Sequence, residues 1–287
     1  MRRRLWAVVA TSLTLAACTG TVNGGITTTS QIPATNPSPS STLPPVVQCP
    51  GAGEFEEGGG IVDVDGESSD ASQLGRISWD TSDQCETFIF VFETSEGAPA
   101  TSVPDIRIDH LQSFQVIRIS LDIAGSVLTD QLVETALVDR LYVVRSLDGA
   151  MFVDLHLNAP AAARASVSAS PATLAVDLRP GFVEFEGTSA IGLETVVVSP
   201  PSGASVDPNG QIVGYTRRAD SNVIVIATQN DVVVFQSAST TSSGDAETWG
   251  EFSTDVALPP GDTSVFVGKQ SSEDGSFDGV TLDLTVN

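Results

Sequence analysis

Short apolar runs rich in β-branched residues, separated by turn residues, fill the chain from about residue 86 to its C-terminal end. In the last third, about seven such runs follow one another at spacings of roughly 8–12 residues, which is typical of a β-sandwich. The runs cover residues 194–199, 210–216, 222–228, 231–237, 250–258, 263–269 and 280–286. We therefore predict a mainly β fold, with one β-sandwich over residues 193–287.

An earlier block begins with the run ETFIFVFE at residues 86–93. Phe88 and Phe90 share one face of an extended chain, and Ile89 and Val91 share the other, so both faces are apolar. This pattern predicts a central strand.

Further strands are expected in the same block over residues 115–122, 141–145, 151–157 and 173–178. The middle two flank Asp148-Gly149, a favoured turn pair, and should form a hairpin. Helix signals are scarce, and residues 130–138 are the one short stretch where a helix is plausible. Because about 240 residues exceed a typical domain, we expect two sandwiches, over 49–181 and 193–287, joined by a linker at 182–192.

The N-terminus has the features of an export signal. Three arginines at positions 2–4 precede an apolar run that is too short to remain as a membrane helix. The run ends in LAAC at residues 15–18, which resembles the lipobox of bacterial lipoproteins. That resemblance implies cleavage between Ala17 and Cys18 and a diacylglyceryl group on the Cys18 thiol. An ordinary secretory signal that is cut near Ala17 is the alternative.

Residues 1–17 are thus predicted to be a signal peptide, and residues 18–48 a disordered tether rich in Thr, Ser and Pro. Two acyl chains give durable membrane attachment, whereas one chain gives reversible binding. The predicted location is the outer face of the cytoplasmic membrane, with the folded part held on a tether of roughly 30 Å.

Two cysteines remain if Cys18 is acylated. Cys49 and Cys85 form an even pair in a compartment that permits disulfides, so we expect them to be bonded. A metal site is the alternative, but two cysteines at this separation without a nearby histidine do not make a zinc set. We expect no metal and no cofactor.

The chain is strongly acidic, with a formal net charge of -23. Its few cationic residues are scattered, whereas nucleic-acid binding needs clustered Lys and Arg. Nucleic acid is therefore not an expected partner.

Two family resemblances cover most of the folded part. Residues 84–181 resemble the AMIN-like domains of actinobacterial lipoproteins, on the segments CETFIFVFE, VVRSLDGAMFVDLHLNAPAA and PATLAVDLRPG. The resemblance implies a non-catalytic β-sandwich that localises envelope proteins by binding peptidoglycan or other wall material. This chain departs from that pattern because no amidase or secretin domain follows the module.

The second block, residues 194–287, is similar to the immunoglobulin-like domain of bacterial spore-germination and related envelope proteins. The similarity rests on VVVSPPSGASV, IVGYT, the Trp249-Gly250-Glu251-Phe252 segment and the Pro260-Gly261 turn, in that order. It implies adhesion or protein contact, without catalytic residues to carry over.

Residues with potential chemistry are few. His110 and His156 are the two histidines, and any Ser-His-Asp arrangement would need one of them, but neither lies in a recognisable motif. The acidic turns at residues 63–70 and 273–279 could ligate calcium, although a solvated acidic loop explains them better. Trp79, Tyr142, Tyr215 and Trp249 are candidates for stacking on sugar rings, and Trp249 is the best of them because it lies near a loop.

Three functions remain open from the sequence. The preferred one is a non-enzymatic surface lipoprotein that binds cell-wall glycan or peptidoglycan and protein partners. The second is an accessory subunit that positions an envelope enzyme or transporter by protein contact alone. The third is a hydrolase that uses His110 or His156.

Overall fold

The computed structural model describes residues 49, 51, 53–66, 68–82, 85–111, 114–185, 187–217, 222–242, 248–270 and 276–287. All of them belong to one compact unit of the chain. The predicted signal peptide, the Ala17–Cys18 cleavage site and the tether lie outside the described residues.

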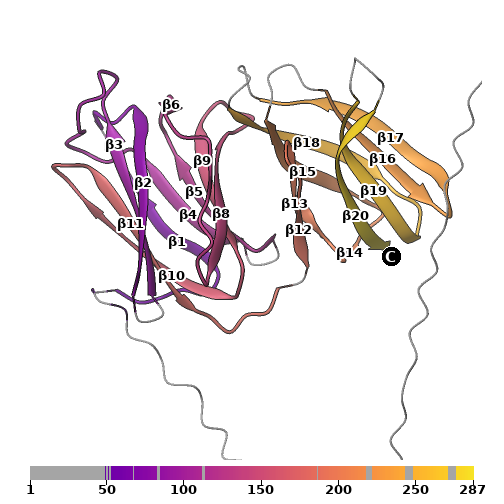
Figure 1. The fold of residues 1–287 in the computed structure, drawn as a ribbon, viewed down its shortest axis with the longest axis horizontal. Coiled ribbons are helices and arrows are strands. Elements are labelled where there is room, and N and C mark those ends of the chain that lie inside the picture. The colour runs from indigo at the N-terminus through magenta and orange to yellow at the C-terminus, as the bar shows by residue number, and fades with distance from the viewer. Residues whose placement is uncertain are drawn as a thin grey trace, which may run out of the picture. The chain divides into compact units, whose positions relative to one another are not determined.

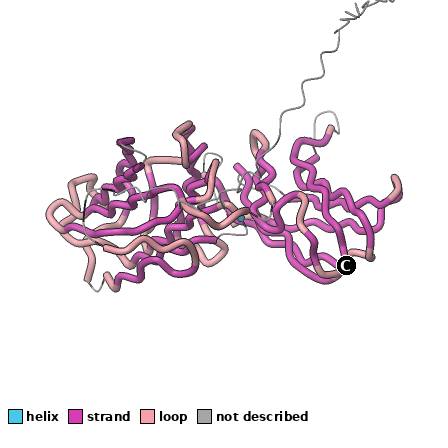
Figure 2. Tube along the Cα trace, turned by 90° about the horizontal axis from the view of Figure 1, so that it is seen from below, coloured by secondary structure: helices cyan, strands magenta, loops and turns pink. Residues whose placement is uncertain are grey.

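The described part of the chain consists of strands joined by turns and loops, and it contains no α-helix (Figure 2). The prediction of a mainly β, sandwich-like fold is confirmed. Within the same residues, no helix is both long and apolar enough to cross a bilayer.

The first block contains eleven strands among its described residues. They are β1 Gly59–Val64, β2 Gln73–Ser82, β3 Cys85–Glu93, β4 Ile106–Leu111, β5 Val116–Leu121, β6 Gly125–Ser126, β7 Asp130–Leu132, β8 Val138–Arg145, β9 Met151–Leu157, β10 Ala161–Ser168 and β11 Thr173–Pro180. One sheet has the order β10-β11-β3-β2-β6, and it packs against strands β1, β4, β5, β9 and β8 around a shared apolar core.

Strand β3 lies between β2 and β11, which confirms the predicted central strand. Phe88, Phe90 and Phe92 are fully buried in the core, whereas Ile89 on the opposite face is partly exposed. The hairpin is confirmed as well, because β8 and β9 pair antiparallel around a turn in which Gly149 has a φ of 93°.

The helix expected at residues 130–138 is absent. Asp130–Leu132 instead forms β7, which pairs antiparallel with β8 and matches Leu132 with Arg140. The weak helical preference of this segment is overridden because β8 offers its backbone a ladder of hydrogen bonds.

The second block contains nine strands among its described residues. They are β12 Thr188–Ile191, β13 Thr195–Ser202, β14 Ser205–Val206, β15 Asn209–Arg217, β16 Asn222–Gln229, β17 Val232–Thr240, β18 Trp249–Ala257, β19 Gly261–Gln270 and β20 Phe277–Val286. The sheet β14-β20-β19-β16-β17 packs on strands β12, β13, β15 and β18 around a second core (Figure 1). The strands β13 and β15 to β20 correspond to the seven predicted runs. Strand β12 lies inside the segment predicted as a linker, so the second block begins earlier than expected.

The two blocks share one ten-stranded sheet rather than being separate sandwiches. Strand β18 pairs parallel with β8, where Trp249 matches Val144 and Gly250 matches Arg145. A third apolar cluster forms beside this pairing from residues of both blocks, namely Val116, Tyr142, Val144, Phe152, Val196, Val198, Tyr215 and Trp249. The joint between the blocks is therefore built like a core.

Candidate functional site

The predicted disulfide is present. Cys49 and Cys85 are bonded across a sequence separation of 36, and both are buried. Of the other predicted site residues, Cys18 and Ala17 lie outside the described residues.

The prediction that Trp249 stacks on a glycan is wrong. Only 1% of this residue is exposed, because its ring lies in the cluster between the blocks, edge-on to Tyr142 and Tyr215. Its indole N–H donates a hydrogen bond of 3.1 Å to Asp130. A ring that is buried and bonded at its nitrogen has no surface left for a sugar.

His156 lies in the same joint and has a structural partner. Its Nε2 shares a hydrogen bond with the hydroxyl of Tyr215, which belongs to the second block. Burial lowers the pKa of His156 to about 4, and burial also raises the pKa of Tyr215 well above its usual value. Both side chains are therefore neutral at pH 7, and the Nε2 atom of His156 is bonded to Tyr215 rather than to a serine.

A buried ion pair completes the joint. The Arg118 guanidinium donates two hydrogen bonds of 2.8 Å to Asp154, lies 3.7 Å from Glu251 and covers the ring of Phe152. Burial acts to lower the pKa of Arg118, but the nearby Asp154 carboxylate outweighs it and raises that pKa. Glu251 also accepts a hydrogen bond from the backbone N–H of Leu147 in the first block.

The remaining candidates either have structural roles or have no hydrogen-bond partner. His110 is buried, neither ring nitrogen has a hydrogen-bond partner, and burial lowers its pKa. Asp70 in the first acidic turn accepts hydrogen bonds from Thr101 and Ser102, which lower its pKa to about 2. No group of three or more His, Cys, Asp or Glu suited to a metal occurs among the described residues, and residues 273–275 of the second acidic turn lie outside them.

A different surface has the features of a binding site, and it lies on the outer face of the sheet formed by β17, β16, β19 and β20. Alternate residues of these strands point away from the core, so the register aligns Ile226 with Phe266 and Thr228 with Ser264. Phe277 is 52% exposed, and its ring meets that of Phe266 edge to face at 5.6 Å.

Two glycines allow the aromatic pair to lie on the sheet. Gly268 and Gly279 are paired across β19 and β20, next to Phe266. A Cβ atom at either position would come within 2.9 Å of the tip of the Phe266 ring, so only glycine leaves room for it. The result is an aromatic platform, which we define as Phe266 and Phe277 with the adjoining Ile224 and Ile226.

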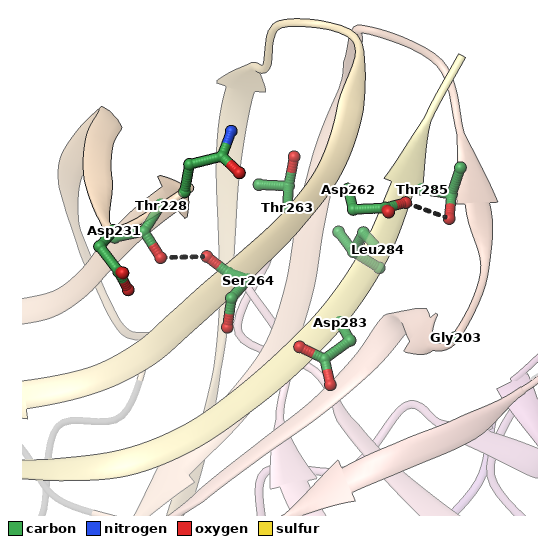
Figure 3. Close-up of a pocket in the computed structure, with 10 residues that line it drawn as sticks. Gly203, Thr228, Asp231, Asp262, Thr263, Ser264, Asp283, Leu284 and Thr285 are labelled. Carbon is green, nitrogen blue, oxygen red and sulfur yellow. Dashed lines mark hydrogen bonds between the residues drawn. The ribbon is translucent and has the colours of Figure 1, made fainter.

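An open polar pocket of about 450 Å³ follows the platform along the same strands (Figure 3). Three aspartates from different loops and strands line it, namely Asp231, Asp262 and Asp283. Thr285 donates a hydrogen bond of 3.3 Å to Asp262, and Thr228 donates one of 3.3 Å to the backbone carbonyl of Ser264. Asp283 in the pocket is paired with Ser264. Ser264 lies two residues before Phe266 on β19, so the pocket and the platform are continuous.

Among the residues that the structure describes, none places a positive charge on this outer face. Lys269 is the one cationic residue in β16, β17, β19 and β20, and it bonds to Glu194 rather than facing the pocket. The face therefore repels phosphate groups and favours neutral or cationic ligands.

The sequence pattern contained this site, although it was not predicted. In residues 263–268, Thr263, Val265 and Val267 point to the core, and the intervening Phe266 is an apolar residue at an outward position. An aromatic residue that breaks the inside-outside alternation was the available signal.

The comparisons with known proteins support the family resemblance of the second block. Residues 195–276 match the model of the Gmad2 family, described as the immunoglobulin-like domain of bacterial spore germination. The predicted immunoglobulin-like domain is thus confirmed there, over strands β13 to β19. Neither the curated proteins nor the solved structures gave a match.

Proposed function

We propose that this chain is a non-catalytic binding protein of the bacterial envelope, held at the outer face of the cytoplasmic membrane through acylated Cys18. Its second block would bind a cell-wall glycan, such as the glycan strand of peptidoglycan, on the outer face described above. The AMIN-like resemblance of the first block points to the same class of ligand.

The observation that carries this proposal is the continuity of the aromatic platform with the polar pocket. A sugar ring has an apolar C–H face that packs on an aromatic ring, and hydroxyls that donate hydrogen bonds to carboxylates. Phe277 supplies an exposed ring, and Asp283 supplies an acceptor six positions further along β20, so a glycan of several sugar rings would contact both. A few convergent polar groups beside an apolar wall are typical of small-ligand sites.

The negative charge of the surface further restricts the class of ligand that it can bind. With three aspartates and no facing cation, the pocket disfavours phosphate-rich wall polymers and anionic lipid head groups. Neutral or amine-bearing sugars fit it best.

The test is co-sedimentation of the protein with purified peptidoglycan and, separately, with a phosphate-rich wall polymer. We expect retention by the first, and we expect Phe277→Ala to weaken it threefold to tenfold, since an aromatic contact contributes about 0.5–1.5 kcal/mol. Phe182→Ala is the matched control, because Phe182 is also exposed but lies outside this face. Equal loss in the two variants, or no retention at all, would refute the glycan site.

The competing proposal is an accessory subunit that acts by protein contact alone. It predicts no retention by either polymer and one dominant partner on crosslinking in cells. A hydrolase that uses His110 or His156 predicts instead a turnover that His→Ala substitution abolishes.

The anchor is tested independently of the ligand. Cys18→Ser should release the protein from the membrane fraction, because the thiol that would be acylated is removed. Persistence of that variant in membranes would contradict the lipoprotein proposal.

A further inference from the structure

We propose that strand β17 accepts an extended, basic segment of a partner protein, which adds to the five-stranded sheet as a further strand. This contact would use the edge of the sheet, whereas the proposed glycan site uses its outer face.

Strand β17 is an edge strand with an open side. It ends the strand order β14-β20-β19-β16-β17 and pairs with β16 alone in the part of the chain that the structure describes. Every second N–H and C=O of an edge strand lacks a strand partner, and such a row is a template for strand addition.

The sequence of β17 lacks the usual protection against strand addition. Its nine residues, VVVFQSAST, contain no charge and no proline. Natural edge strands are normally shielded by charged side chains, proline, bulges, short length or a covering segment. The single bulge here follows the pair Ala227–Phe235, so residues 235–240 remain regular.

The other strands that end a described sheet are short or shielded in one of these ways. Strand β10 contains Arg164 and is bridged at Ala163 by Glu56, while β1 contains Asp63 and a bulge. Strand β12 has four residues, and β6 and β14 have two each. Strand β17 differs from these end strands, because it is nine residues long and contains neither charge nor proline.

The strand is also held in place for pairing. The hydroxyl groups of Ser239 and Thr254 share a hydrogen bond of 2.7 Å, which ties β17 to β18 of the facing sheet. Such preorganisation lowers the entropy lost on binding. At the other end, Val232 and Val233 are 62% and 55% exposed, so they offer apolar contacts to the side chains of an added strand.

Charge complementarity selects a basic partner over a second copy of this chain. Asp231 immediately precedes β17, and Asp262 and Asp283 lie in the same pocket, while no cation of the neighbouring strands faces them. Two copies would each carry a net charge of -23, which opposes self-pairing. A partner strand with Lys or Arg near the Asp231 end would be attracted instead.

The test begins with selection of binders to the full-length protein in detergent from a random peptide display library. We expect an enriched family in which β-branched residues alternate and Lys or Arg lies at one end. Enrichment of acidic or uncharged sequences, or no enrichment, would overturn the proposal. Formation of a dimer through β17 would also overturn it, because the occupant would then be a second copy.

Two proline variants locate the contact. Successive N–H groups of a strand point to opposite sides, so one of Ser237→Pro and Ala238→Pro removes an N–H on the open edge. The variant that melts like the parent should lose binding of the selected peptide at least tenfold, and unchanged binding would refute edge pairing. If neither variant folds, methylation of alternate backbone nitrogens of the peptide gives the same answer. One set of methylations should abolish binding and the other set should leave it intact.

The role of charge is tested with Asp231→Asn, which suits the positive φ of 61° at this position. Loss of an exposed ion pair should weaken binding of the selected peptide roughly twofold to fivefold. Asp122→Asn on the first block is the matched control and should have no effect. Phe277→Ala should spare peptide binding, so the peptide site and the glycan site can fail separately.

Discussion

The hydrogen bond between His156 and Tyr215 joins the two blocks at the centre of a buried aromatic cluster. His156 lies on β9 in the first block, and Tyr215 lies on β15 in the second. Because both groups are buried and neutral, each depends on the other for a partner. The joint is therefore sensitive to substitutions on either side.

Tyr215→Phe removes the hydroxyl and leaves the His156 nitrogen buried without a partner. We expect a loss of about 1–3 kcal/mol in the free energy of unfolding, measured by urea titration. Tyr142→Phe is the control, since the Tyr142 hydroxyl has only a long contact of 3.5 Å with Arg140. Equal effects of the two substitutions would contradict a special role for the His156 bond.

Acid should weaken the fold through His156. Its pKa is about 4 in the folded protein and 6.5 in an unfolded chain, so the unfolded state binds the proton more tightly. Stability is therefore highest above pH 6.5 and falls as the pH drops toward 4, by up to about 3 kcal/mol from this residue. Urea midpoints measured from pH 7 to pH 4 check this, and His156→Gln should flatten the slope. An unchanged slope in that variant would assign the effect elsewhere.

Arg118→Met should be the most damaging single change at the joint. It leaves the carboxylate of Asp154 fully buried without its partner, which costs about 3–5 kcal/mol of unfolding free energy. The double variant Arg118→Met/Asp154→Leu should recover much of that loss, because no unpaired charge remains. A double variant as unstable as the sum of both single variants would show that the pair is not coupled.

The disulfide between Cys49 and Cys85 should stabilise the first block. The bond joins residues with a sequence separation of 36. Removing it should lower the unfolding free energy by about 3–4 kcal/mol in the chain-entropy description. Thermal melts with and without a reductant test this. The melting temperature of the parent should fall on reduction. The Cys49→Ser/Cys85→Ser variant should have a lower melting temperature from the start, and the reductant should not change it.

Much of this architecture could be predicted because strand alternation is a local signal. Residues 86–93 and the seven runs of the second block show which side chains face the core, and the disulfide follows from having two remaining cysteines. The joint could not be predicted in this way. Trp249, Tyr215 and Tyr142 are buried on the faces opposite the two sandwich cores, and their burial depends on the pairing of β8 with β18. Nothing in either local pattern specifies that long-range contact.

The wrong prediction of a helix at residues 130–138 and the failure to predict the aromatic platform have the same origin. Segment 130–132 becomes a strand because β8 is available to pair with it. Phe266 is presented on the surface because Gly268 and Gly279 are aligned across neighbouring strands. Both outcomes depend on register between distant segments rather than on the residues alone.

The position of the disulfide also determines how the protein responds to mechanical force. Cys49 is bonded to Cys85, the first residue of β3, and β3 is flanked by β2 and β11. A pull on the chain from the N-terminal side of Cys49 therefore reaches the middle of a sheet through a covalent bond, without first unravelling residues 50–84. Two ladders of hydrogen bonds, to β2 and to β11, then share the tension.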